Sequence, residues 1–195
     1  MPEADSYDAY LIALLEAHPS ELVLDDGAGN GRFSHALASL GCRVIALDIS
    51  SKLLDAIHER SNTEGVEIVR ADMRRLPFQP GIFDRVLCVH NLWYIKELGL
   101  AVEEIRRVMR RGGICVGDHL NVLDLSRYLS WRFLGTFVKS MLGRSFVDMG
   151  RSSRTFTKPF QQVKIRTHSV MSYSPLVVKD GITTFAKRFI VVAEA

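Results

Sequence analysis

The feature that most constrains this chain is a glycine-rich stretch near its beginning, ELVLDDGAGNGRFS at residues 21–34. It opens with a short apolar run at residues 22–24, which is typical of a buried parallel strand, and it continues into the apolar spacing of a helix. Between the two stand Gly27, Gly29 and Gly31, which permit positive φ and let a ligand lie directly against the main chain. A strand, a glycine turn and a helix in this order predict a nucleotide-class binding site.

The end of the next strand and the glycine spacing indicate whether the cofactor is a nicotinamide dinucleotide or another nucleotide-class molecule. This strand is expected at residues 43–47 and it ends on Asp48, where an acid can accept both hydroxyls of a ribose. A dinucleotide-binding turn requires its third glycine one place later than Gly31, and that place is Arg32. A long side chain there would crowd the helix against the strand, so the spacing disfavours a nicotinamide cofactor.

The pattern of two apolar residues, an acid and three alternating glycines, followed by an acid at the end of the next strand, resembles the class I S-adenosylmethionine-dependent methyltransferases. In that family the glycine turn passes under the methionine part of the cofactor, and the second acid holds the ribose. By position, the resemblance implies cofactor contacts from Asp25, Gly27, Ala28, Gly29, Gly31, Asp48 and Ile49. Asp26 departs from the family, which usually has an apolar residue there. It can be a second polar contact to the cofactor or a half-exposed strand end.

A second motif follows the strand expected at residues 66–69. Asp72 stands just past the strand end and Met73 comes directly after it. Such an acid can accept a hydrogen bond from an exocyclic amine, while the apolar neighbour covers a flat ring. The pair matches the adenine-recognition motif of the methyltransferases, which implies that Asp72 and Met73 contact the adenine.

Candidate catalytic residues follow the strands expected at residues 85–89 and 114–117. In an open α/β sheet the ligand lies outside the carboxyl ends of the strands, so His90, Asp118 and His119 are expected to face the site. His90 is expected near the transferred methyl group, with ordinary hydrogen bonding as the alternative. If the acceptor arrives protonated, these three residues are the candidate general bases.

The resemblance implies an α/β fold with a Rossmann-like, doubly wound sheet. Seven mainly parallel strands are expected, the last of them antiparallel, with helices on both faces. At 195 residues and 47% hydrophobic content the chain fits a single domain, residues 1–195. Residues 1–20 are expected to form an N-terminal helix, residues 21–118 the cofactor-binding core, and residues 119–195 a helix, a basic loop and a terminal hairpin on the substrate side.

The helix expected within residues 7–17 has two possible roles. It can pack beside the first strand, or it can cap the cofactor through Tyr7 or Tyr10.

Three features are expected in the carboxy-terminal part. A helix at residues 123–142 covers the sheet, although its apolar face also suits a lipid surface. A basic loop follows it at residues 144–158, and from Arg144 onward nine basic residues stand against three acidic ones. These cations can receive an anionic acceptor or can simply be solvated. Two strands, residues 163–173 and 183–193, end the chain.

The composition limits the kinds of binding partner that are expected for this chain. The net charge of +3 gives no argument for nucleic acid or an acidic membrane, and no apolar window reaches the length of a membrane span. The acidic start differs from a targeting segment, which predicts a cytoplasmic protein without stable membrane association. Cys42, Cys88 and Cys115 lack metal-ligand spacing and are expected to be reduced core thiols, so no metal is predicted.

Together these features predict a methyltransferase that moves a methyl group from S-adenosyl-L-methionine to a small-molecule acceptor by in-line displacement. The absence of an Asn-Pro-Pro-Tyr type motif after the fourth strand argues against methylation of DNA bases. Two alternatives remain at this point: a non-catalytic binding or scaffold protein of the same fold, and a nicotinamide-dependent oxidoreductase.

Overall fold

The structure is a computed structural model, and it describes residues 6–59, 64–120, 160, 162–169, 172–177 and 188–195. Helices and strands alternate along most of this length, as a doubly wound α/β fold requires. The elements are α1 (Ser6–Leu15), β1 (Leu22–Asp26), α2 (Arg32–Ser39), β2 (Arg43–Asp48), α3 (Ser51–His58), β3 (Val66–Arg70), β4 (Phe83–Cys88), the 3-10 turn η1 (Leu92–Tyr94), α4 (Leu98–Val108), β5 (Met109–Leu120), β6 (Gln162–Ser169), β7 (Ser172–Val177) and β8 (Arg188–Glu194).

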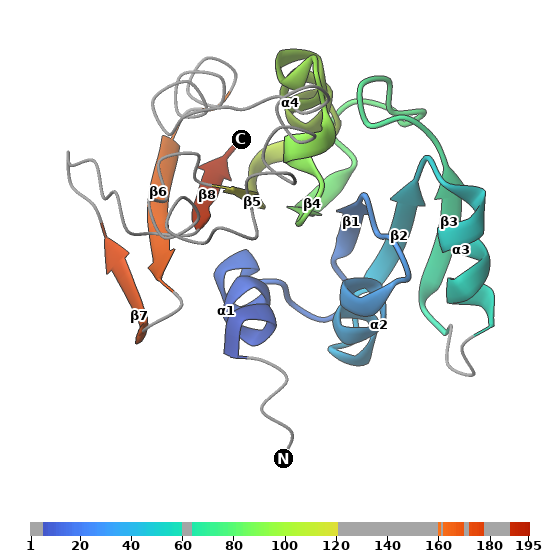
Figure 1. The fold of residues 1–195 in the computed structure, drawn as a ribbon. Coiled ribbons are helices and arrows are strands. Elements are labelled where there is room, and N and C mark those ends of the chain that lie inside the picture. The colour runs from blue at the N-terminus through green and yellow to red at the C-terminus, as the bar shows by residue number, and fades with distance from the viewer. Residues whose placement is uncertain (1–5, 60–63, 121–159, 161, 170–171, 178–187) are drawn as a thin grey trace, which may run out of the picture.

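The strands form one sheet in the order β3-β2-β1-β4-β5-β8-β6-β7, which Figure 1 shows from right to left. Neighbours from β3 to β5 pair in parallel, and β8 runs antiparallel to both β5 and β6. The predicted Rossmann-like sheet with a reversed last strand is therefore confirmed. Its order changes direction at β1, so a cavity is expected where the chain leaves β1 and β4.

Over the described residues the sheet has eight strands, one more than predicted. The segment expected as a single strand at residues 163–173 forms both β6 and β7, which pair antiparallel. An alternating apolar pattern has the same period before and after a chain reversal, so the sequence did not reveal the reversal. The predicted helix at residues 123–142, the basic loop at 144–158 and the turn at 179–181 lie outside the described residues.

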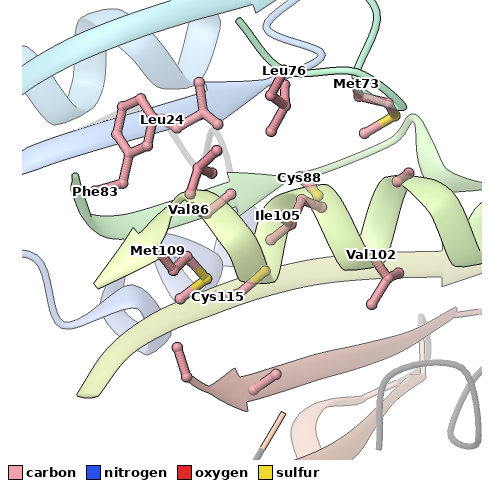
Figure 2. Close-up of a cluster of buried hydrophobic side chains, with 14 of the residues drawn as sticks. Leu24, Met73, Leu76, Phe83, Val86, Cys88, Val102, Ile105, Met109 and Cys115 are labelled. Atoms are coloured by element: carbon pink, nitrogen blue, oxygen red, sulfur yellow. The ribbon is translucent and has the colours of Figure 1, made fainter. Parts of the chain in front are cut away.

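Apolar side chains cover both faces of the sheet. Leu24 of β1 belongs to a buried cluster with the inner side of α4, and Figure 2 shows Val86 and Ile105 of this cluster. The neighbouring residue Val23 belongs to a second cluster with α1 and α2, which contains Leu37. Successive residues of a strand face opposite sides, so β1 contributes to both layers.

The strand expected at residues 114–117 begins earlier than predicted. Helix α4 ends at Val108, and β5 starts at the next residue, Met109. The pairing between β4 and β5 is irregular here, and Gly112 has φ of 77°. Local periodicity does not show this bulge, because it results from the pairing with β4.

The three cysteines, Cys42, Cys88 and Cys115, are buried and carry free thiols. Among the residues that the structure describes, no helix has both the length and the apolar character needed to cross a membrane.

Phe83 provides a test of the core. It is 0% exposed and contacts Phe78 edge to face, with the ring centroids 5.0 Å apart. We expect Phe83→Ala to lower the free energy of unfolding by about 3 to 5 kcal/mol, the usual cost of removing a buried aromatic ring. Urea denaturation measures this change. Leu100→Ala is the control, because Leu100 is 52% exposed, and it should cost less than about 0.5 kcal/mol. Equal losses in the two variants would contradict this description of the core.

Candidate cofactor site

A cavity of about 780 Å³ lies at the carboxyl ends of β1, β2 and β4, within the size range of small-molecule sites. Most of the predicted cofactor-binding residues line it: Gly27, Ala28, Gly29, Asp48, Ile49, Asp72, Met73 and His90. Asp25 and Gly31 are not among its lining residues. The strand order therefore brings motifs from three separate parts of the sequence to one cavity.

The glycine turn is fixed by its neighbours. The backbone N–H groups of Gly27 and Ala28 both donate to the Leu47 carbonyl, over 2.7 and 2.8 Å. Gly27 has φ of 83°, and a Cβ added to it would lie 2.0 Å from Asn91 Nδ2. By contrast, a Cβ added to Gly29 would meet no atom within 4 Å. The turn is thus closed by Asn91 at Gly27 and open at Gly29, where a ligand can approach the backbone.

Asp48 joins the end of β2 to this turn. Its Oδ2 accepts from the Gly29 N–H over 2.9 Å, and its Oδ1 accepts from the Ser50 N–H over 2.9 Å. Each carboxylate oxygen has a further lone pair, so the group can accept two hydroxyl donors from the cavity as well. The two bonds hold Asp48 in the orientation that such recognition needs.

Asp25 and Gly31 support the site from outside the cavity. Asp25 is 2% exposed and accepts from Ser34 Oγ over 2.5 Å, which ties β1 to α2. Burial raises the pKa of Asp25 to about 6, and the Ser34 bond partly offsets this rise. A Cβ on Gly31 would lie 2.9 Å from Ile57, so the glycine allows α2 and α3 to pack closely.

Asp72 also lines the cavity and is already bound by Arg74. The Arg74 guanidinium lies 2.6 Å from Asp72 Oδ2, and a second nitrogen of the same group lies 2.6 Å from Glu97 Oε2. The bond from Arg74 holds the pKa of Asp72 below its ordinary value. This role of Arg74 was not predicted from the sequence, in which the only indication of the ion pair is a cation two residues after the acid.

Three residues from distant parts of the chain meet beside the cavity. Asp118 Oδ1 accepts from the His90 backbone N–H over 2.6 Å, and Asp118 Oδ2 accepts from Tyr7 Oη over 2.9 Å and lies 3.4 Å from His90 Nε2. Asp118 was expected to face the site, but it is 0% exposed, is not among the residues that line the cavity, and contacts His90 from behind. His90 has φ of 64°, an uncommon value for a residue other than glycine. Asp118 therefore holds His90 in its conformation.

Two roles were predicted for helix α1, packing beside the first strand or capping the cofactor, and the structure shows packing. Tyr7 and Tyr10 both pack against the buried cluster beneath α1 and α2, and neither is among the residues that line the cavity. The ring of Tyr7 also stacks on His90, with centroids 6.1 Å apart. The third candidate base, His119, pairs with Phe189 through the β5 and β8 backbones, and its side chain lies outside the described part of the structure.

Asp26 differs from its neighbour Asp25 in that its carboxyl group has no hydrogen-bond partner among the described residues. It is 0% exposed, so the interpretation as a half-exposed strand end is wrong. Neither of its carboxyl oxygens has a hydrogen-bond partner among the described residues, although it lines the cavity. Burial raises its pKa well above the ordinary value, and the negative charges of Asp25, Asp48 and Asp72 raise it further.

Comparison with known proteins agrees with this geometry. A family model described as a methyltransferase domain matches residues 24–117, from the middle of β1 into β5. Residues 24–117 are therefore a methyltransferase domain, in agreement with the resemblance to the class I S-adenosylmethionine-dependent methyltransferases. The motif residues that resemble this family are those that line the cavity, apart from Asp25 and Gly31.

Two relatives and one solved structure are similar to this chain. Demethylmenaquinone methyltransferase of Thermobifida fusca is 37% identical over 126 residues, which cover 62% of this chain and 53% of that protein. Malonyl-[acyl-carrier protein] O-methyltransferase of Yersinia pestis is 34% identical over 123 residues, which cover 57% of this chain and 45% of that protein. A crystal structure of an S-adenosylmethionine-dependent methyltransferase from Mesorhizobium loti superposes with a TM-score of 0.77 at 15% identity, covering 99% of both chains. The chain spans about half the length of these curated relatives.

Gly27 and Gly81 offer a matched test of the turn. Both have positive φ, but a Cβ on Gly81 would meet nothing within 4 Å, whereas a Cβ on Gly27 would clash with Asn91. We expect Gly81→Ala to cost about 1 to 2 kcal/mol of backbone strain. Gly27→Ala should cost about 1 to 3 kcal/mol more, because the wall must also move. Thermal and urea denaturation measure both values, and equal costs would show that Asn91 does not confine the turn.

Asp26→Val should stabilise the free protein, because it removes a buried polar group without a partner. We expect a gain of about 1 to 3 kcal/mol in the free energy of unfolding. Since the folded-state pKa of Asp26 is raised, the folded protein retains a proton that the unfolded chain releases above its ordinary pKa. Asp26 therefore destabilises the protein increasingly as the pH rises toward its folded-state pKa, and the gain should grow in the same direction. Urea denaturation over a pH series tests this, and a pH-independent gain would contradict it.

Proposed function

We propose that this chain is a methyltransferase that binds S-adenosylmethionine in the cavity and transfers its methyl group to a small-molecule acceptor. The observation that carries the proposal is that the glycine turn, Asp48 and the Asp72–Met73 pair line one cavity. These are the three elements by which the family holds its cofactor. The names of the two curated relatives, which methylate demethylmenaquinone and malonyl-[acyl-carrier protein], support an acceptor outside the nucleic acids.

The residues present fit this cofactor. The open face of the turn at Gly29 leaves room for a ligand against the backbone, and Asp48 beside it can accept the ribose hydroxyls. The backbone N–H, Nε and Nη2 of Arg74 all donate to Asp72 and fix its orientation, which leaves one of its roughly four lone pairs for the adenine amine. The low exposure of Met73 gives the flat ring an apolar wall. When bound, the cofactor supplies a methyl group on a cationic sulfur, which is already a good leaving group.

The protein's own task is to orient the reactants and to exclude water. His90 lines the cavity, so it is the group that can take a proton from an acceptor that arrives protonated. Asp118 is buried behind it and acts as a positioning residue, with Tyr7 donating to the same carboxylate. An anionic acceptor is supported by sequence alone, because the basic residues from Arg144 to Lys158 lie outside the described residues.

Calorimetric titration with S-adenosylmethionine, S-adenosylhomocysteine and NAD tests the proposal. The first two should bind and NAD should not. We expect Asp48→Ala to weaken S-adenosylmethionine binding by about 1 to 3 kcal/mol, the usual cost of losing a charged hydrogen-bond acceptor. Asp55→Ala is the control, because Asp55 lies exposed on α3 and does not line the cavity. Unchanged affinity in a folded Asp48→Ala variant would refute the ribose assignment, and binding of NAD alone would refute the proposed function.

A further inference from the structure

The wall of the cavity contains buried oxygens that lack donors. Both carboxyl oxygens of Asp26 and the Oδ1 of Asn91 have no hydrogen-bond partner among the described residues. Both residues line the cavity, and Asn91 Nδ2 donates to the backbone carbonyl of Asp26, so the two side chains are held next to each other. Buried polar atoms are normally paired, so three oxygens without a hydrogen-bond partner at one point indicate that a polar or charged group of a ligand binds there.

No cation of the described protein supplies this need. Arg32 lies 3.0 Å from Asp8, and Arg74 is shared between Asp72 and Glu97. Lys96 also lines the cavity, but it makes no hydrogen bond to the Asp26 carboxyl or to Asn91 Oδ1. Within the described ranges, no group of three or more histidine, cysteine or acidic side chains is placed to hold a metal ion. The missing partner is therefore expected to come from the ligand.

The groups around Asp26 make its ionisation unfavourable while the cavity is empty. Asp25 precedes it on β1, Asp48 ends β2, Asp72 follows β3, and all three raise the pKa of Asp26. Cys88 of β4, the fourth titratable group nearby, is buried and has a raised pKa, so its thiol is neutral. Ionised Asp26 would be a fourth carboxylate charge without water or a donor to stabilise it, so the protonated form is favoured. A positive charge in the cavity would instead favour the ionised form.

We propose that Asp26 and Asn91 form an acceptor subsite through which the cavity selects a cationic ligand, and that the Asp26 carboxyl releases its proton to solvent when the cation enters. This inference rests on the proposed function, because S-adenosylmethionine offers two organic cations, the sulfonium and the ammonium of its amino acid. The sulfonium loses its charge when the methyl group leaves. A subsite that responds to the sulfonium would therefore bind the substrate form of the cofactor more tightly than the product form and would favour product release.

Three ligands separate the two cations. S-adenosylmethionine carries both, S-adenosylhomocysteine carries only the ammonium, and 5′-methylthioadenosine carries neither. Each is titrated calorimetrically into the wild type and Asp26→Asn at neutral pH, in buffers of different ionisation enthalpy. The slope of enthalpy against buffer ionisation enthalpy counts the protons released.

The wild type should release protons on binding S-adenosylmethionine, and its affinity should rise with pH by up to about tenfold per unit, the limit for one proton. Asp26→Asn should lose this proton release and bind S-adenosylmethionine about tenfold or more weakly, since an opposite charge nearby shifts a carboxyl pKa by roughly 1 to 3 units. Its affinity for 5′-methylthioadenosine should not change. Proton release with S-adenosylmethionine alone identifies the sulfonium as the source, and equal release with S-adenosylhomocysteine identifies the ammonium.

Two controls keep the outcomes distinct. Asp55→Asn makes the same substitution on the exposed face of α3 and should match the wild type in affinity and proton release. Asp26→Val, which should fold more stably than the wild type, must show the same loss as Asp26→Asn. If the wild type binds neither S-adenosylmethionine nor S-adenosylhomocysteine, the proposed function fails. If it binds both and Asp26→Asn binds them equally well with unchanged proton release, only the subsite is refuted.

Discussion

The hydrogen bonds between the glycine turn and the end of β2 are the constraint on which the site depends. Leu47 accepts from two successive backbone N–H groups of the turn, and Asp48 accepts from Gly29. Because β1 and β2 pair in parallel with Asp26 opposite Leu47, the end of one strand fixes the path of the chain leaving the other. The position of the proposed ribose acceptor and the shape of the turn are thus set together, and a change in one moves the other.

Two adjacent aspartates show how the pleat of one strand creates different chemistry. Asp25 faces α2, where Ser34 satisfies its carboxylate, and it serves the packing of strand and helix. Asp26 faces the α4 side, where Leu47, opposite to it on β2, and the nearby Cys88 offer it no hydrogen bond. The first acid is therefore satisfied by packing against the helix, and the second is the carboxyl of the proposed acceptor subsite.

The cluster of His90, Asp118 and Tyr7 beside the cavity depends on contacts between residues far apart in the sequence. Tyr7 and Asp118 are separated by 111 positions, and their hydrogen bond joins α1 to the end of β5. The buried carboxylate also holds the left-handed backbone of His90 through its N–H. The N-terminal helix thus contributes to the site by positioning other residues, without lining the cavity itself.

The sequence by itself determined the parts of this protein that follow from local pattern. The spacing of the glycines, the acids at strand ends and the alternation of apolar runs predicted the Rossmann-like sheet, its reversed last strand and most of the cavity wall, because the carboxyl ends of parallel strands meet at one edge. Only the tertiary structure decided the ion pair of Arg74 with Asp72, the contact of Asp118 with His90, the unsatisfied carboxyl of Asp26 and the division of residues 163–173 into two strands. Each of these depends on which side chains or strands become neighbours in space or on where the chain reverses, and neither apolar periodicity nor motif spacing carries that information.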